Sequence, residues 1–575
     1  MNFRKHVLIL LMAMFVFALV LAGCSGEETT GENDITNEDQ EAPTDNGNDN
    51  SNTNDEPSDE NVEVQPLMVG LSPAGQWQEN FNPFSTNATG GTNGLIYQSL
   101  WYFDSVSGDE FPVLATEFEW TNDNTTLVAT LREGVTWSDG EAFDADDVVF
   151  TFDILKEYPA ADTSGIWQQV TSIEKQGDYS VAFNFDAPNV PFQTYVLGAL
   201  IVPEHIWKDL GDPSQAQISD PVGTGPYVLE SFDPQLYKMV KNESHYDAGE
   251  YTVEELQFPA YTGNDSEQLD LVAGKLDWTG IFIPDAENVY VAQDADNNHF
   301  WFPPSNNVTL YPNLENELLS DVTLRKAISL AIDRQKLSDQ AASGYDPLPS
   351  ATALILPRDE QWIDPSIPEE ELSYEFNTDK AVQTLEDAGY KKGDDGIFVS
   401  PGGEKLSFTL QTVSGWTDWA TMAQLISQAL TDMGIEVTVQ MPEFASYHAN
   451  VTGGEYDLAI SWTNAGPTPY RQYQDMLNSN GSWNLQQWND PKTDEALQTY
   501  QGTTDMEEQL EAVYYLQNVM VEHLPAIPLV NGPVWYEYRT ENWVGWPTEE
   551  DPYVNPAPFN WPAPAFVLKN LEPAN

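Results

Sequence analysis

The chain has 575 residues but a single cysteine, Cys24, so no disulfide can form within it. Basic residues are also scarce: 22 Lys and Arg stand against 92 Asp and Glu, which gives a net charge of −70. A surface that binds nucleic acid needs a basic stripe, so we expect no nucleic-acid partner. The six histidines are scattered without the spacing of a zinc site. We therefore expect no metal and no cofactor.

The excess of acid has two explanations. It keeps the surface soluble by self-repulsion, or it suits life at high salt, where the screening length falls to about 3 Å at 1 M and the repulsion is lost. We favour a saline or saline-alkaline habitat, and hence a halophilic protein.

A long apolar run is missing except near the N-terminus. Residues 1–23 combine a basic start, an apolar run over Val7–Val20 that is short for a membrane span, and an ending in small residues. The next residue, Cys24, resembles the lipid-bearing cysteine of the bacterial lipobox; the alternative is an ordinary signal peptide with an incidental cysteine. We expect a lipoprotein anchored through Cys24 to the extracellular face of the cell membrane, or to its periplasmic side where an outer membrane exists.

Residues 24–62 contain no Lys or Arg and almost no large apolar side chain. Such a segment cannot bury enough surface to offset the entropy of ordering, and its like charges extend it. It is predicted to be a disordered acidic tether, with folded sequence starting near Val64.

The stretch Gly415–Tyr473 has the clearest alternation of elements. Its apolar spacing predicts a helix, a strand, a short helix and a buried strand over residues 417–433, 435–441, 444–451 and 456–462. Strands that alternate with helices pair in parallel, and ligands bind beyond the carboxyl ends of such strands. The loop after Trp462 is therefore the expected place for a binding site.

Three acidic or amide residues mark the starts of other helices. Asp144 is predicted to cap a helix, and this explains the acidic run around it better than a calcium loop, whose ligand spacing is missing. Asp321 is predicted to cap one helix over residues 322–337, with Arg325 and Lys326 opposite its apolar face. Asn377 or Thr378 caps a helix over 380–388, and residues 506–523 form a long helix.

Motifs of catalysis are not found. The sequence has no HExxH, no GxSxG and no P-loop, and the S-x-x-K match at Ser172–Lys175 lies in a strand-rich segment without its companion motifs. A glycoside hydrolase needs two carboxylates about 5–9 Å apart, which no motif marks. We expect no enzyme, and a secreted glycoside hydrolase is the remote alternative.

Four blocks, Trp137–Phe152, Asp220–Leu229, Asp321–Arg334 and Leu524–Val530, resemble in order and spacing those of the extracellular solute-binding proteins of family 5. The resemblance covers nearly everything from Val64 onward. It implies an α/β fold: a two-lobed, periplasmic-binding-protein-like clamshell of type II with an extra domain in lobe 1. It also implies closure of the lobes on a small-molecule ligand, and delivery to the permease subunits of an ABC importer by a monomer.

The resemblance also suggests domain boundaries. Lobe 1 is expected over residues 63–305, with the extra strand-rich domain at about 110–200. Lobe 2 is expected over residues 306–523, and residues 524–575 are expected to return to lobe 1.

The class of ligand is inferred from one difference between this chain and the peptide-binding members of the family. Peptide-binding members carry, in the loop that corresponds to residues 461–470, an aspartate that pairs with the peptide's α-ammonium; here this loop has no carboxylate. Burying an unpaired ammonium costs several kcal/mol, whereas sugars bind to flat aromatic faces and amides. Together with Gly415–Trp419, the neutral loop resembles the branch that binds cellobiose-like β-linked oligosaccharides. An oligopeptide or dipeptide receptor of the same family is the alternative.

The candidate ligand contacts are mostly aromatic. They are Trp462, Asn464, Trp416, Trp419, Trp77, Trp278 and Tyr470.

Overall fold

The computed structural model describes residues 65–71, 75–85, 87–481 and 483–574. The predicted signal peptide, the lipid-bearing Cys24 and the acidic tether lie outside the described residues. Everything below concerns the unit that begins at Glu63.

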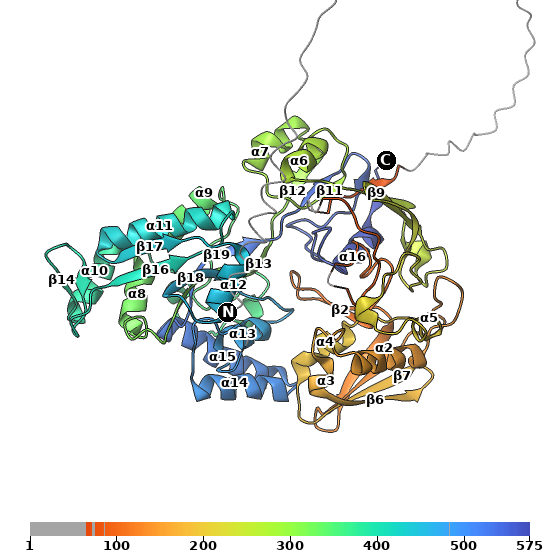
Figure 1. Ribbon diagram of the computed structural model, residues 1–575, viewed down its shortest axis with the longest axis horizontal. Coiled ribbons are helices and arrows are strands. Elements are labelled where there is room, and N and C mark those ends of the chain that lie inside the picture. The colour runs from red at the N-terminus through yellow and green to blue at the C-terminus, as the bar shows by residue number, and fades with distance from the viewer. Residues whose placement is uncertain (1–64, 72–74, 86, 482, 575) are drawn as a thin grey trace, which may run out of the picture. The chain divides into compact units, whose positions relative to one another are not determined.

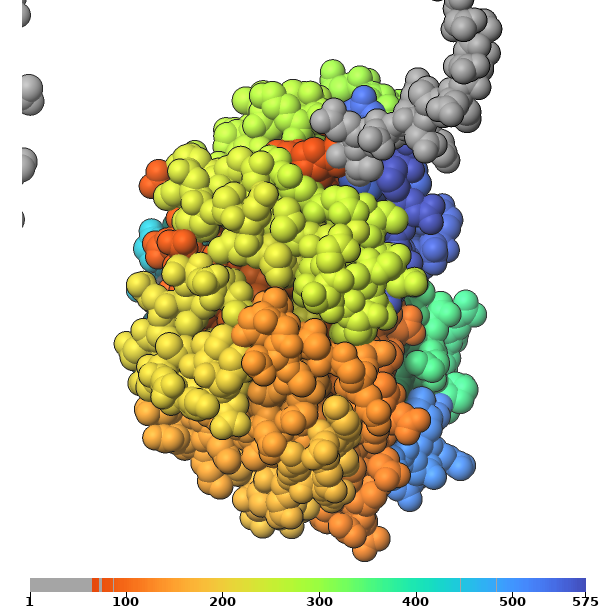
Figure 2. All heavy atoms as spheres, turned by 90° about the vertical axis from the view of Figure 1, so that its right-hand side faces the viewer, coloured from red at the N-terminus to blue at the C-terminus, as the bar shows by residue number. Residues whose placement is uncertain are grey.

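Lobe 1 is built on two small sheets. One has the order β1-β10-β9-β8 and the other β11-β20-β12. Their bounds are β1 Leu67–Met68, β8 Tyr227–Asp233, β9 Leu236–Lys241, β10 Glu255–Pro259, β11 Trp278–Thr279, β12 Asn298–Phe300 and β20 Glu537–Arg539. Large aromatic side chains fill the space between the sheets and the C-terminal helix α16, Ala563–Asn570. In Figure 2 the C-terminal segment, in dark blue, lies against this part of lobe 1.

The extra domain is a four-stranded antiparallel sheet within lobe 1. Its order is β4-β5-β7-β6, with bounds β4 Ala115–Thr121, β5 Thr126–Leu131, β6 Val170–Gly177 and β7 Ser180–Phe185. Helix α2, Ala145–Glu157, packs on β6 and β7 (Figure 1). As predicted, Asp144 caps α2, and Asp147 completes a capping box.

Short elements link these sheets. They are β2 Trp101–Phe103, β3 Glu110–Pro112, α3 Ile166–Gln169, α4 Gln193–Leu197, α5 Glu204–Trp207, α6 Asn264–Val272 and α7 Ala286–Val289.

Lobe 2 is a five-stranded sheet between two layers of helices. The order is β17-β16-β18-β13-β19, with bounds β13 Pro304–Pro312, β16 Ser407–Gln411, β17 Glu436–Gln440, β18 Leu458–Trp462 and β19 Ile527–Pro533. Along β18 the side chains alternate: Leu458 and Ile460 pack against one helical layer, whereas Ala459 packs against the other. Figure 1 shows both helical layers.

The helices of lobe 2 follow the sequence patterns closely. They are α8 Val322–Ala331, α9 Arg334–Ala341, α10 Thr378–Asp387, α11 Thr417–Met433, α12 Phe444–Thr452, α13 Tyr470–Leu477, α14 Pro491–Gly502 and α15 Met506–His523. The predictions for α11, α12, α15 and the strands β17 and β18 are confirmed. Asn377 is the cap of α10.

The predicted single helix over 322–337 is wrong, because the chain breaks at Ile332 and Asp333 caps a second helix, α9. The predicted exposed face is also wrong for Arg325, whose side chain is buried. Its guanidinium donates to the carbonyl oxygens of Leu319, Ser320, His523 and Leu524 at 2.6–2.9 Å, so it ties the start of α8 to the end of α15.

Two segments connect the lobes, one between β12 and β13 and one between β19 and β20. Strand β19 pairs with β13 and so belongs to lobe 2; the return to lobe 1 starts after Pro533 rather than at residue 524. Strand β20 pairs with β11 and β12, and the chain ends with α16 and a bridge between β21 Trp543–Val544 and β22 Glu572–Pro573.

Candidate functional site

Three parallel strands of lobe 2 end at the same edge of its sheet. Strand β16 pairs in parallel with both β17 and β18, as the alternation of strands and helices predicts. Each strand has an aromatic residue at or after its carboxyl end. Trp416 follows β16, Phe444 follows β17, and Trp462 is the last residue of β18. This carboxyl edge therefore gathers side chains from three segments that are separate in the sequence.

Six rings form one aromatic cluster at this edge. Its members are Trp416, Trp419, Phe444, His448, Trp462 and Trp483. Trp462 is central, with ring centroids 6.2 Å from Trp416, 6.1 Å from Trp419 and 5.0 Å from Trp483. The rings of Trp416 and Phe444 are nearly parallel, 5.8 Å apart and inclined by 26°.

Part of the aromatic cluster faces solvent. Trp416 is 38% exposed, Phe444 45% and the neighbouring Met441 37%, whereas Trp419 is buried beneath them. Large apolar side chains that remain exposed together make this edge a candidate binding surface, because water contact with them is unfavourable. The buried Trp419 fixes the ring of Trp416 edge-on at 4.9 Å.

The backbone of Trp462 is held in place. Its carbonyl oxygen accepts hydrogen bonds from Trp483 Nε1 at 2.8 Å and from Tyr311 Oη at 3.2 Å. The next residue, Thr463, exchanges two hydrogen bonds with Asn307 of β13. A binding surface held this firmly loses little entropy when a ligand docks.

An acid lies close to the loop even though the loop has none. Asp475, on α13, accepts from Asn464 Nδ2 at 2.7 Å and from Arg471 Nε at 3.1 Å. Burial raises the pKa of Asp475, and the cation of Arg471 opposes this shift. The amide nitrogen of Asn464 is thus engaged by the protein, and the charge of Asp475 is balanced locally.

Three buried polar atoms at the same edge lack a hydrogen-bond partner. They are Thr412 Oγ1, Asn307 Oδ1 and Asn531 Oδ1. Thr412 follows β16, and Asn307 and Asn531 face each other in the pairing of β13 with β19. Buried polar atoms are almost always bonded, so these three atoms have acceptor capacity that the described residues leave unused.

A pair of carboxyl groups lies next to the aromatic cluster. Burial, and to a smaller extent the nearby charge of Asp418, raise the pKa of Asp346 to about 8. Asp418 stands between Trp416 and Trp419 in the sequence, and burial raises its pKa too. The neighbouring Tyr345 packs against Phe302 and Trp535 of the two connecting segments. Sequence patterns gave no sign of this pair, since Asp346 comes from a loop far from α11.

Three of the predicted contacts lie elsewhere. Trp278 is 1% exposed in the core of lobe 1, with its Nε1 donating to Pro556 O at 2.8 Å, so it offers no face to a ligand. Tyr470 is buried against Tyr500 at 4.7 Å and donates to Gln474. Trp77 packs half-buried on lobe 1, where its Nε1 donates to Phe258 O.

The structure thus brings together Trp416, Trp419, Trp462 and Asn464. It adds Phe444, His448 and Trp483, which the sequence analysis missed. Phe444 directly follows a predicted strand, so the strand-end rule was sufficient to find it. Trp483 comes from the segment between α13 and α14, and no local pattern indicates its position.

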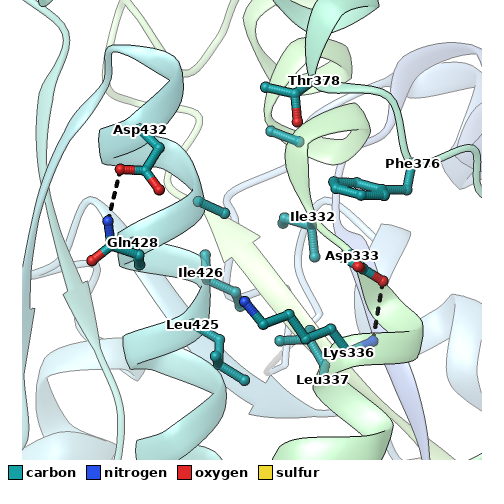
Figure 3. A pocket seen from close by; sticks show the side chains of 12 residues that line it. Ile332, Asp333, Lys336, Leu337, Phe376, Thr378, Leu425, Ile426, Gln428 and Asp432 are labelled. Atoms are coloured by element: carbon teal, nitrogen blue, oxygen red, sulfur yellow. Dashed lines mark hydrogen bonds between the residues drawn. The ribbon is translucent and has the colours of Figure 1, made fainter.

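An apolar hollow on lobe 2 lies away from the aromatic cluster. It has a volume of about 210 Å³ and is lined by residues at the α8–α9 break and along the second half of α11, including Ile332, Lys336 and Leu425 (Figure 3). The aromatic cluster lies beyond the opposite end of α11, which starts at Thr417. This hollow is therefore separate from the candidate site.

No group of three or more metal-binding side chains occurs within the described ranges. Among the helices of those same residues, none has both the length and the apolar character that a membrane crossing requires.

Fold and site together define a two-lobed α/β receptor for a small molecule. The chain belongs to the bacterial extracellular solute-binding proteins, family 5, whose middle region matches residues 111–484. It is the substrate-binding receptor of an ABC importer, in a family of extracellular or periplasmic binding proteins rather than enzymes.

Several relatives are similar over most of their length. Oligopeptide-binding protein AppA of Bacillus subtilis is 26% identical over 504 residues, which are 80% of this chain and 82% of that protein. A periplasmic oligopeptide-binding protein from Thermotoga maritima is 27% identical with a TM-score of 0.79, covering 88% of this chain and 99% of that one. A structure of this same Thermotoga maritima protein with mannohexaose bound is 28% identical with a TM-score of 0.70, covering 88% of this chain and 98% of that one.

Proposed function

We propose that the receptor captures a β-linked oligosaccharide of the cellobiose type and delivers it to its importer. The observation that supports this most is the aromatic cluster, whose exposed rings Trp416 and Phe444 lie nearly parallel. Pyranose rings present flat C–H faces that cover such rings, and their hydroxyl groups donate to acceptors such as Asn307 Oδ1 and Thr412 Oγ1. The similar protein with mannohexaose bound supports a saccharide ligand.

An oligopeptide is the second candidate. The name of the Bacillus subtilis relative supports it, and so does the carboxyl pair of Asp346 and Asp418. A peptide's α-ammonium beside that pair would favour ionisation of Asp346 and lower its pKa. A hydrolase would require two carboxylates across a glycosidic bond.

A thermal-shift panel separates these candidates. Cello-, xylo- and manno-oligosaccharides and a mixed peptide library are each added at increasing concentration. A true ligand at a hundredfold excess over Kd stabilises the protein by about 2.7 kcal/mol. A shift with oligosaccharides and none with peptides supports the proposal, and the reverse result overturns it. Release of reducing ends from the same sugars would indicate a hydrolase.

We also propose that Cys24 carries a lipid anchor. The chain expressed in its host should label with radioactive palmitate and sediment with membranes. The Cys24→Ser variant should do neither, and a wild-type chain that stays unlabelled would contradict the anchor.

A further inference from the structure

Arg358 contacts both lobes at once. Its guanidinium donates from Nη1 to the carbonyl oxygen of Ser105, in lobe 1, at 2.6 Å, and to that of Gly466, in the loop after β18, at 2.9 Å. The side chain is only 5% exposed. Gly466 belongs to the loop that follows Trp462, so a single cation joins lobe 1 to the loop that carries candidate ligand contacts.

The guanidinium is oriented on the lobe 2 side by Asp359. Arg358 Nε and Nη2 bond the two oxygens of the Asp359 carboxylate at 2.7 and 2.8 Å, which is the bidentate geometry that fixes the plane of an arginine. Asp359 is itself anchored, since Oδ2 accepts from the backbone N–H of Ile355 at 2.9 Å. Asp359 therefore fixes the orientation of Arg358 Nη1, which donates to the carbonyl oxygens of Ser105 and Gly466.

The receiving turn on lobe 1 is equally firm. Asp104 is fully buried, and its Oδ1 accepts from the backbone N–H groups of Val106 and Ser107 at 2.9 and 2.6 Å. Its Oδ2 accepts from Tyr102 Oη and from the backbone N–H of Asn555. This network fixes the turn that carries the Ser105 carbonyl group, so the carbonyl is preorganised for a donor from lobe 2.

The lobes are in van der Waals range of each other beside Arg358. Gly108, in the same turn, has φ +78°, and a Cβ atom there would lie 3.4 Å from the carbonyl oxygen of Pro467 and 3.7 Å from Arg358 Cγ. The other hydrogen bonds across the lobes involve uncharged groups: the backbone N–H of Ala286 donates to Tyr345 Oη at 2.6 Å, Gln501 Nε2 donates to Asn189 Oδ1 at 3.3 Å, and Asn124 Nδ2 donates to Gly502 O at an exposed site. Arg358 is the buried, charged contact among them.

We propose that Arg358 is a positioning residue that latches the closed lobes and sets the Gly466 loop at the same time. The bond to Ser105 exists only when the lobes are together, so it stabilises the closed state selectively. A ligand that orders the Gly466 loop also orders an acceptor of Arg358, so occupancy and closure reinforce each other. The proposal rests on the proposed function only in that this loop carries ligand contacts; it holds for a saccharide or a peptide.

The test measures closure directly in the full chain. With Cys24→Ser as background, spin labels are placed at Glu119→Cys on β4 and Glu386→Cys on α10, both exposed, and pulsed electron paramagnetic resonance gives the distance distribution with and without ligand. The parent should show a short-distance, closed component. Because a hydrogen bond from a charged donor is among the strongest in proteins, Arg358→Met should lower the closed-to-open ratio by about tenfold or more.

Three further variants make the result decisive. Arg358→Lys retains the charge as a point donor without the fork, so it should rescue the ratio in part. Gly108→Val places a branched side chain against Pro467 at a φ of +78°, which also strains the turn that carries Ser105, so it should open the lobes while Arg358 and Asp359 stay intact. Gln501→Ala is the matched control, since it removes a weak contact between the lobes and should leave the ratio within about twofold of the parent.

The outcomes separate the two proposals. A merely structural ion pair with Asp359 would lower the melting temperature of Arg358→Met and leave its closed-to-open ratio unchanged, which would overturn the latch. If Arg358→Met fails to fold, Arg358→Lys decides, and a closed-to-open ratio equal to that of the parent would then overturn the latch. A parent without a closed component in any condition also overturns it. If no sugar binds, the proposed ligand fails, but the distances without ligand still decide the latch.

Discussion

Trp416 offers the sharpest test of the aromatic cluster, because it is exposed and its loss should cost binding rather than folding. Its side chain is 38% exposed. If a tryptophan presents about 250 Å² when free, about 95 Å² of Trp416 remains for a ligand to cover. At about 25 cal/mol per Å², full coverage stabilises the complex by about 2.4 kcal/mol, and coverage of one half by about 1.2 kcal/mol.

Trp416→Ala should therefore raise Kd by about eightfold to about sixtyfold, measured by isothermal titration calorimetry with the best ligand from the panel. The melting temperature should change little, since the buried Trp419 and the partly buried Trp462 keep most of the cluster together. Trp416→Phe should recover part of the affinity. Leu269→Ala, which removes another exposed apolar side chain at 71% exposure on lobe 1, is the matched control and should leave Kd unchanged. An unaltered Kd in Trp416→Ala would refute the assignment of this edge as the ligand site.

The remaining predictions concern stability. Asp346 has a pKa of about 8 in the folded protein and about 4 when unfolded, so the folded state binds more protons between these values and its stability falls as pH rises through that window. Urea titrations at pH 5 and pH 9 give the free energy of unfolding at each pH, and Asp346→Asn should reduce the difference between them by a few kcal/mol. An unchanged difference would show that Asp346 ionises normally. Asp321→Ala removes the cap of α8 and the acceptor of Tyr390 Oη, so it should cost about 1–3 kcal/mol without altering Kd; a change in Kd of tenfold would contradict its scaffold role. At a net charge of −70, raising NaCl from 0.1 to 2 M should raise the melting temperature by several degrees, as differential scanning fluorimetry can measure, whereas a flat or falling curve would argue against self-repulsion.

Local sequence patterns predicted the helices and strands whose formation depends on residues that are close together in the sequence. The apolar spacing of α11, the alternation along β17 and the caps Asp144 and Asp321 all express short-range chemistry, and each agrees with the structure. The strand-end rule also placed Trp462 and the loop after it at the carboxyl edge of the sheet, because parallel pairing follows from the order of elements. Trp416 was proposed from the family resemblance instead.

Long-range packing explains the errors. The break at Ile332 needs the buried guanidinium of Arg334, which bonds Ser329 and Pro528 across two elements, and no periodicity reveals it. Trp278 was a reasonable candidate as an indole near a strand, yet the core of lobe 1 encloses it. Trp483 and Asp346 come to the site from distant loops, so only the fold shows that they belong there.

The central claim is that the exposed rings of the aromatic cluster bind a saccharide. A crystal structure of the protein with the strongest ligand from the panel tests it most directly. We predict a pyranose ring lying flat against Trp416 or Trp462, with hydroxyl groups reaching Asn307 or Thr412. A bound peptide whose ammonium pairs with Asp346 and Asp418, or a sugar that leaves these indoles uncovered, would contradict it.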